Sequence, residues 1–531
     1  MKTYIDKTAY KYFVLCFSWF LALGCTSDLD DIDTNNINAN NAFQTNEDYL
    51  AFLGKLYGGL SLTGQQGPAG QGDLIGFDEG ASNYARNYWN LNEFTADALK
   101  WRFSDSGFRE LHENTWTPDN DVISAMYNRI IFQVTQANEF IRQVQGLDDA
   151  EIATFRAEGR FLRALSYYHG LELFGGNIPF VTEEDLPGAF LPEQTNGADL
   201  FAYIESELLA IENELLDPGQ PQFYGRADRG AAWTLLAKLY LNAEAFIGQN
   251  RYADCVSVCE NILGAGYQLD PEYGALFRAD NNLAEGIIFP IPHDGVETQS
   301  FGLGFILTNG SVSSDLSADL GLTGNAQAFA AISCREEFTR LYEYPNDDPF
   351  DDSPDSRAAF LYKIGHSIEV PVPPVGSAFT DGFAYTKFRN MLTDGSSGQD
   401  DRQADMDFPL FRLADVYLMY AEAVLRGGGG SEALALDLVN QVRQRAYGDS
   451  SGDVTTIDLQ FILDERGREL SWEGQRRTDL VRFGQYTGSN YLWDWKGGAP
   501  QGSSIENFRN IFPLPASDLT ANPNLEQNPG Y

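Results

Sequence analysis

The sequence contains few histidines, few cysteines and few basic residues. Of its 531 residues, 4 are His and 5 are Cys, and 36 Lys and Arg stand against 76 Asp and Glu, for a formal net charge of −40. Nucleic acids and anionic membranes bind clustered Lys and Arg, so this balance argues against both as partners. The histidines are widely separated and form no HExxH motif, and no Walker loop is present. The sequence therefore carries neither a metal-peptidase signature nor a P-loop signature that would indicate an enzyme.

One apolar run stands out near the N-terminus. Three lysines precede Tyr12–Leu23, which is followed by Gly24 and Cys25. A basic start, an apolar run of about a dozen residues and a small residue before the cut are typical of a secretory signal, and this run is too short to span a bilayer stably. The Gly-Cys ending favours a lipoprotein signal over residues 1–24 with Cys25 acylated, although Ala22 stands where such signals prefer Leu. Ordinary cleavage after a small residue is the alternative.

Residues 25–45 are acidic and then rich in Asn, with almost no apolar periodicity. Such a composition is typical of a solvated tether. The acidic cluster directly after Cys25 is similar to the surface-export signal of bacteria that display lipoproteins. We therefore expect a protein that is anchored in the outer membrane through Cys25 and exposed at the cell surface.

The mature chain has three further cysteines, at positions 255, 259 and 334. The odd number excludes a complete disulfide framework. Cys255 and Cys259 lie one helical turn apart, and no His is near them. We expect core packing there, rather than a metal pair or a local bridge.

Apolar residues at helical spacing predict a series of helical hairpins. The clearest pair covers 119–145 and a second helix that is N-capped by Asp148 and stops at the Gly-Gly pair 175–176. Further helices are expected over 46–60, 197–216, 228–247, 251–264, 408–426 and 431–447. Small Ala residues between large apolar ones resemble tetratricopeptide-type packing at irregular spacing. We predict a mainly α scaffold that forms one domain over 46–531.

Two regions lack long helical periodicity. The segment 61–118 is rich in Gly and polar aromatics, and an insertion at about 265–407 is rich in Gly, Asp, Pro and aromatics. Long connections without structure of their own are usually functional. Within the first region, GFDEGASNYARNYWN (76–90) combines carboxylates, an arginine and rings in a pattern that could cut sugars or hold them. The rings of Tyr84, Tyr88 and Trp89 are expected to support the loop.

The charged run 462–484 is a second candidate for chemistry. Glu465 and Glu469 lie one helical turn apart with arginines nearby. We expect a half-buried ion network that braces the C-terminal helices, rather than a catalytic site. Its predicted members are Glu465, Glu469, Glu473, Arg476, Arg477 and Arg482.

Five blocks of sequence identify a family by resemblance. They are AEGRFLRALSYYHGLELFGGNIPF (157–180), GRADRGAAWTLLAKLYLNA (225–243), PLFRLADVYLMYAEAVLR (409–426), ERGRELSWEGQRRTDLVRFG (465–484) and IFPLPASDLTANPNLEQNPGY (511–531). Together they resemble the SusD/RagB family of outer-membrane nutrient-binding lipoproteins, over essentially residues 25–531. Within the family the chain looks closest to the starch-binding branch, through 62–80, YGRAD (224–228) and YLWDWKGGA (491–499).

The resemblance implies a lipid-anchored glycan binder without enzymatic activity. Family members cap a SusC-like TonB-dependent transporter and pass oligosaccharides to it. The implied fold is mainly α, with about four tetratricopeptide-like hairpins and a loop-rich insertion that carries the ligand site. No cofactor is implied; some members bind Ca²⁺, but no oxygen-rich loop in this sequence can be assigned to one.

The resemblance also implies a set of glycan-binding residues. They are Asp78, Arg86, Trp101, Phe103, Ser106, Phe301 and Phe305. Asp78 and Arg86 match the two charged contacts of the starch-binding branch, with an ion pair that serves loop structure as the alternative. Trp101 matches a neighbouring tryptophan, with core packing in a short helix as the alternative.

This chain departs from the family pattern at several of these positions. Phe103 replaces the main stacking tryptophan, and Ser106 replaces an asparagine. Phe301 and Phe305 are candidates for one ring of the family's aromatic arc. Where the last tryptophan would fall, only Phe329 is near. A smaller ring offers less stacking area, so we expect weakened or redirected glycan binding.

Three alternatives to a glucan binder stay open. The glycan could be a β-1,3-glucan or a fructan. A glycosidase would use Asp78 with Glu79, or Glu93 with Asp97. Neighbours in sequence on a loop rarely face each other at the roughly 5–9 Å that this chemistry requires. Glu93 and Asp97, at helical spacing, could do so, but nothing near them in the sequence marks an acid with a raised pKa. A tetratricopeptide adaptor for a protein partner alone would retain no glycan.

Overall fold

The computed structural model describes residues 43–531, apart from 187, 189, 321 and 323–326. The chain divides into two compact units, Met1–Leu50 and Ala51–Tyr531. The predicted signal, Cys25 and nearly all of the predicted tether lie outside the described residues. In the described end of the first unit, the ring of Phe43 stacks on that of Tyr49, with centroids 5.7 Å apart. No helix within the described ranges is long and apolar enough to cross a membrane.

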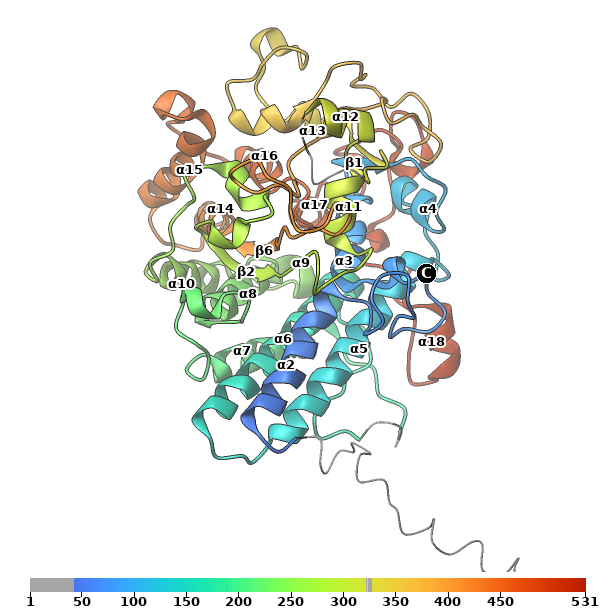
Figure 1. The fold of residues 1–531 in the computed structure, drawn as a ribbon, viewed down its shortest axis with the longest axis vertical. Coiled ribbons are helices and arrows are strands. Elements are labelled where there is room, and N and C mark those ends of the chain that lie inside the picture. The colour runs from blue at the N-terminus through green and yellow to red at the C-terminus, as the bar shows by residue number, and fades with distance from the viewer. Residues whose placement is uncertain (1–42, 187, 189, 321, 323–326) are drawn as a thin grey trace, which may run out of the picture. The chain divides into compact units, whose positions relative to one another are not determined.

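The prediction of a mainly helical protein is confirmed. The longest helices are α5 (Asp121–Val144) and α6 (Ala150–Phe174), which pack as an antiparallel hairpin. Figure 1 places α7 (Gly197–Ile211) beside them, where it packs against α6. The N-cap of α6 is Asp149, one residue beyond the predicted cap, because its carboxylate accepts from the amides of the first turn. Gly175 ends α6 at φ 69°, a left-handed conformation that favours glycine.

The remaining hairpin helices also follow the apolar periodicity. Helix α8 packs against α10, α10 against α14, and α14 against α15. The bounds are α2 (Asn46–Ser61), α8 (Arg229–Leu241), α9 (Ala243–Ile247), α10 (Tyr252–Leu263), α14 (Leu413–Leu425), α15 (Glu432–Tyr447), α16 (Leu459–Glu469), α17 (Arg476–Arg482) and α18 (Ala516–Ala521). Cys255 and Cys259 are buried and free on α10, as core packing requires.

The helix predicted over 408–426 is wrong in its first turn. Residues Phe408–Arg412 form strand β6, which pairs antiparallel with β2 (Ile287–Ile291). Both strands are buried along their whole length. A segment that is buried on all sides has no polar face, so its periodicity does not separate a strand from a helix.

Buried segments also explain two errors in the region 61–118. Residues Tyr84–Glu93 form helix α3, and all ten are buried, so no amphipathic stripe announces the helix. Residues Leu99–Trp101 form strand β1 instead of a short helix, and β1 pairs with β3 (Ile332–Cys334). This pairing joins the N-terminal loop region to the insertion.

Where the structure describes it, the insertion has only short elements, as predicted. They include α11 (Leu303–Gly310), α12 (Ser314–Asp319), α13 (Glu336–Thr339), β4 (Leu361–Tyr362) and β5 (Ala384–Tyr385). Helix α4 (Phe108–Glu113) follows β1 on the N-terminal side. Figure 1 shows α11, α12, α13, β1 and α4 in the upper part of the view, above the helical hairpins α5 and α6.

The ion network predicted near the C-terminus exists, and it is buried more deeply than expected. Glu465 and Glu469 are 0% exposed and Glu473 is 2% exposed. We call the following set the C-terminal ion network: Asp355, Arg357, Lys387, Arg412, Arg443, Arg445, Glu465, Arg468, Glu469 and Glu473. The surrounding arginines lower the pKa of Glu465 to about 2, against the opposing effect of burial.

The predicted arginine partners of this network are wrong. Arg476 pairs with Asp97, and Arg482 pairs with Glu422 and Asp479. Arg477 donates to backbone carbonyls of residues 509 and 510. Helical spacing identifies neighbours within one helix, whereas several of the actual partners come from residues 355–412, which only the tertiary fold brings to α16.

Candidate functional site

Phenylalanine rings from three distant segments meet near β1 and α11. Ring centroids are 6.5 Å apart between Phe103 and Phe329, 5.3 Å between Phe329 and Phe305, and 5.2 Å between Phe305 and Phe301. The first two contacts are stacked, and the third is close to perpendicular. All four rings are partly exposed. We call Phe103, Phe329, Phe305 and Phe301 the ring ribbon.

Backbone hydrogen bonds hold these segments together. The amide of Arg102 donates to Ala331 O at 3.0 Å, which continues the pairing of β1 with β3. The amide of Phe329 donates to Asn309 O at 2.9 Å, and that of Ala331 donates to Gly310 O at 2.7 Å. The end of α11 is thereby tied to the strand that pairs with β1, and this places Phe305 next to Phe329.

Trp101 lies beneath the ring ribbon and is 4% exposed. Its ring centroid is 5.9 Å from that of Phe103 and 6.1 Å from that of Phe329. Its Nε1–H donates to Asp105 Oδ2 at 2.7 Å. The structure therefore favours core packing for Trp101, in which it supports the rings above it and presents little surface of its own.

A polar pocket of about 290 Å³ lies beside the ring ribbon. Three of the predicted site residues, Asp78, Arg86 and Ser106, line it together with Asn90, Asp105 and Asp121. Asn83 accepts from the amide of Arg86 and so begins α3, the helix that places Arg86 in the pocket. Arg86 Nη1 donates to Phe301 O at 3.1 Å, which links the polar pocket to the ring ribbon.

The polar pocket holds groups that have no partner among the described residues. Nε of Arg86 and Oδ1 of Asn90 are buried without a hydrogen bond. Buried polar atoms are usually paired, so these two are positioned for a ligand or for water. Burial lowers the pKa of Arg86, and the carboxylates of Asp105 and Asp78 oppose that shift. Ser106 donates to the Asp121 carboxylate, so its hydroxyl hydrogen is already used.

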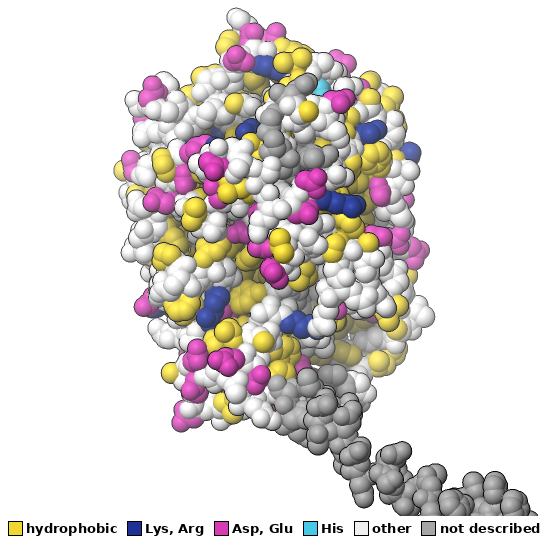
Figure 2. Space-filling model, in the orientation of Figure 1, with side chains coloured by type: hydrophobic (Ala, Val, Ile, Leu, Met, Phe, Trp, Pro, Cys, Tyr) yellow, Lys and Arg dark blue, Asp and Glu magenta, His cyan; other side chains and the backbone are white. Residues whose placement is uncertain are grey.

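Sequence reasoning missed the arginines that stack on the ring ribbon. The guanidinium carbon of Arg402 is 4.5 Å from the Phe301 centroid and 5.9 Å from that of Phe305. The guanidinium carbon of Arg102 is 4.3 Å from the Phe103 centroid. Arg102 stands within KWRF and could have been noticed, but no local signal marks Arg402. In the view of Figure 2, hydrophobic side chains lie beside a Lys or Arg side chain over the region where Figure 1 places α11.

Three of the four candidate catalytic carboxylates, Glu79, Glu93 and Asp97, are buried, and only Asp78 lines the polar pocket. Glu93 is fully buried and accepts from the Gly474 amide at 2.7 Å, and burial raises its pKa to about 8. Asp97 is 1% exposed and is paired with Arg476. Glu79 is buried and accepts from the Thr63 hydroxyl. Neither predicted carboxylate pair is therefore placed to flank a substrate bond.

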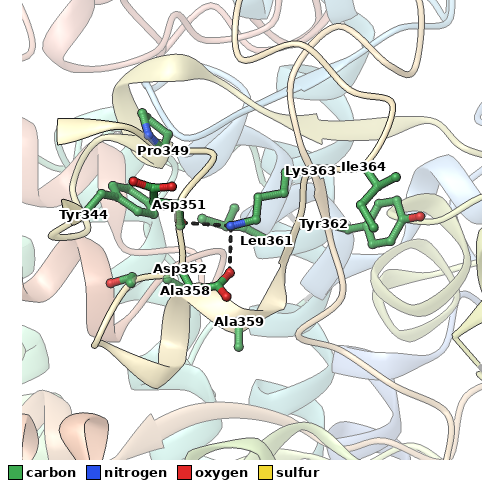
Figure 3. A pocket seen from close by; sticks show the side chains of 11 residues that line it. Tyr344, Pro349, Asp351, Asp352, Ala358, Ala359, Leu361, Tyr362, Lys363 and Ile364 are labelled. Atoms are coloured by element: carbon green, nitrogen blue, oxygen red, sulfur yellow. Dashed lines mark hydrogen bonds and ion pairs between the residues drawn. The ribbon is translucent and has the colours of Figure 1, made fainter. Parts of the chain in front are cut away.

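A separate cavity of about 390 Å³ lies in the insertion, lined by Tyr344, Asp352, Tyr362 and Lys363 (Figure 3). The ammonium group of Lys363 donates to Asp351 O at 2.8 Å and to Asp352 Oδ1 at 3.0 Å. Among the described residues that line this cavity, Lys363 is the only cation and is already paired, and no row of rings is present. Within the described ranges, no group of three or more His, Cys, Asp or Glu could hold a metal ion.

The fold and the candidate site together define a class of protein: a helical-hairpin scaffold with a row of partly exposed rings beside a polar pocket. The SusD family model matches residues 371–531. The chain is 35% identical to the starch-binding protein SusD of Bacteroides thetaiotaomicron, over 96% of this chain and 97% of that protein. The chain belongs to the SusD family.

Other relatives agree with this assignment. The SusD-like protein P2 of Formosa agariphila is 24% identical over 80% of this chain and 83% of that protein. Among solved structures, a laminarin-binding SusD-like protein aligns with a TM-score of 0.68 at 22% identity, over 92% of this chain and all of that chain. Surface glycan-binding protein A of Bacteroides thetaiotaomicron, solved with laminarihexaose, aligns with a TM-score of 0.66 at 20% identity, over 91% of this chain and 100% of that chain. These structures share the fold.

Proposed function

We propose that this protein is a cell-surface lipoprotein that binds a glucan, such as starch or a maltooligosaccharide, without cleaving it. It then delivers the glycan to a SusC-like TonB-dependent transporter. The observation that carries the proposal is the ring ribbon, which assembles partly exposed rings from Phe103, Phe301, Phe305 and Phe329. Such rings serve as platforms for the apolar faces of pyranose units.

The polar pocket complements the rings. Asp78 and Arg86 stand beside Phe301 and hold sugar hydroxyls through charge-assisted hydrogen bonds, which are stronger than neutral ones. A ring that contacts the glycan contributes about 0.5–1.5 kcal/mol beyond the area that it buries. A row of moderate contacts of this kind suits a protein that must capture a chain and then release it.

Glucan is the proposed ligand because the relative with 35% identity is a starch-binding protein. β-1,3-Glucan is the second candidate, because the ring ribbon consists of phenylalanines and two solved neighbours are named for laminarin or laminarihexaose. A fructan would have to use the same rings. A glycosidase is disfavoured because the carboxylates of Glu93 and Asp97 are enclosed by protein groups.

Anchoring at Cys25 is supported by the predicted lipoprotein signal, and transfer to the transporter is supported by the family. No Ca²⁺ or other cofactor is assigned a role. We expect the tagged, full-length protein to copurify with an outer-membrane transporter from its native membrane. A Cys25→Ala variant should be released from the outer membrane.

Affinity electrophoresis in gels that contain starch, laminarin or levan tests the ligand. We expect retardation in starch and about tenfold weaker retention by Phe305→Ala, because the central stacking contact is lost. Phe190→Ala is the matched control, since Phe190 is exposed outside the ring ribbon. If the protein releases reducing ends from these glycans over time, it is a glycosidase and the proposal of a non-cleaving binder is wrong. If no glycan in the gel changes its mobility, the proposal is also wrong, and an adaptor for a protein partner is favoured.

A further inference from the structure

The guanidinium of Arg402 is the only Arg or Lys group at the ring ribbon or the polar pocket that has no hydrogen bond or ion pair within the described residues. Nη1 of Arg86 donates to Phe301 O, and Nε of Arg102 donates to Ala330 O at 2.5 Å. Arg402 is exposed, and its guanidinium lies over the rings of Phe301 and Phe305. A cation in a chain with net charge −40 would be expected to find a carboxylate.

The backbone around Arg402 is nevertheless fixed. Its amide donates to Asp400 Oδ1 at 2.8 Å, and Asn309 Nδ2 donates to its carbonyl at 3.0 Å. The adjacent Gln403 accepts from the amide of Ser300 at 3.1 Å through Oε1. Asp400 thus bonds the main chain and not the guanidinium, and the loop is tied directly to α11 and to the segment that carries Phe301.

We propose that Arg402 is a glycan-contacting residue and that Phe301 acts chiefly as its positioning residue. This inference rests on the proposed function. A guanidinium 4.5 Å from the Phe301 centroid covers one face of that ring, so this face is not available to a sugar. Stacking holds the planar group in place, and its N–H donors point outward along its edge, toward a glycan on the neighbouring Phe305. Two of these donors can bind adjacent hydroxyls of one sugar unit.

Arg102 provides an internal comparison. It also stacks on a ring, and its amide and carbonyl are bonded as those of Arg402 are, but its side chain is bonded as well, since Nε donates to Ala330 O at 2.5 Å. Arg102 therefore joins segments of the fold, whereas the side chain of Arg402 is free for a ligand. Substitution of Arg102 should lower stability and binding together, and substitution of Arg402 should lower binding alone.

Calorimetric titration with maltoheptaose, and in parallel with laminarihexaose, tests the inference. For the glycan that wild type binds, Arg402→Ala should raise Kd about tenfold, the effect of losing hydrogen bonds to a charged donor. The melting temperature should not change. Arg402→Lys should not restore affinity, because lysine lacks the planar fork. The matched control is Arg340→Ala, which removes an exposed arginine that pairs with Glu336 on α13.

A double substitution tests the role of Phe301. If Phe301 acts through Arg402, Phe301→Ala combined with Arg402→Ala should weaken binding no more than about twofold beyond Arg402→Ala alone. If the fold-changes in Kd of the two single substitutions multiply in the double variant, Phe301 contacts the glycan by itself. Equal or tighter binding by Arg402→Ala would overturn the inference while the proposed function stands. Failure of wild type to bind either glycan would overturn both.

Discussion

The C-terminal ion network and the ring ribbon contain the same kinds of side chain, but these side chains have different roles in the two regions. In the network, Arg357 is 0% exposed and its guanidinium is paired with Asp355, Glu465 and Glu469. At the ring ribbon, Arg402 is exposed and its guanidinium bonds none of the described residues. The first set is closed among protein groups, and the second is left open toward solvent.

Structural charges and candidate binding charges differ in burial and in pairing. Arginines, carboxylates and aromatic rings are frequent in both regions, so residue type alone does not distinguish them. Buried charges that pair with one another fix the positions of helices, and burial closes them to a ligand even where single atoms such as Nε and Nη1 of Arg445 lack a partner among the described residues. Partly exposed groups that are held in place but lack a partner have that capacity. Substitutions should therefore affect stability in one region and affinity in the other.

The largest expected effect comes from opening the ion network. Arg412→Met removes the guanidinium that bonds Glu469 and Glu473, and the free energy of unfolding should fall by about 3–5 kcal/mol because two buried carboxylates lose a partner. Urea denaturation measures the change. Arg340→Ala, at an exposed pair, should change stability by less than about 1 kcal/mol. If Arg412→Met folds but no longer binds glycan, the ion network also affects affinity, and the two regions do not differ as stated above.

A smaller effect per pH unit is expected from a buried carboxyl beside this region. Burial raises the pKa of Glu93 to about 8 from its ordinary value of 4.5, so the folded protein keeps a proton that the unfolded chain releases. Stability should therefore fall as pH rises from about 4.5 toward 8, by at most about 1.4 kcal/mol per pH unit.

Glu93→Gln should flatten this slope, because an amide does not titrate and its oxygen can still accept from Gly474. Thermal melts between pH 5 and 8 measure the effect. Asp352→Asn is the control, since that carboxylate is fully exposed. An unchanged slope in Glu93→Gln would mean that Glu93 is ionised in the folded protein.

The smallest effect is expected from a substitution within the ring ribbon. Phe103→Trp enlarges an outer ring of the ribbon, which is partly exposed and therefore has room on one side. The affinity for maltoheptaose should rise about two- to fivefold, within the range of one aromatic contact, and the melting temperature should stay constant. If affinity falls instead, the ribbon is matched to phenylalanine and hence to a different glycan.

Local sequence signals predicted much of the scaffold. Helices α5 and α15 were predictable because each presents an apolar stripe to the core and carries a side-chain cap at its start. Helix α3 and strand β6 were not, because they are buried on every side and lack a polar face. At the site, the family pattern predicted Asp78 and Arg86, which line one pocket, but its predicted set omitted Phe329.

The sequence by itself therefore determined the helical hairpins, the family and the residue types of the site, because periodicity, caps and motifs are local properties. Only the tertiary structure decided which distant side chains meet. Phe329 reaches the ring ribbon through the pairing of β1 with β3, and Arg402 reaches Phe301 through a loop that Asn309 holds. These contacts depend on backbone bonds between segments far apart in the chain, and no local pattern records them.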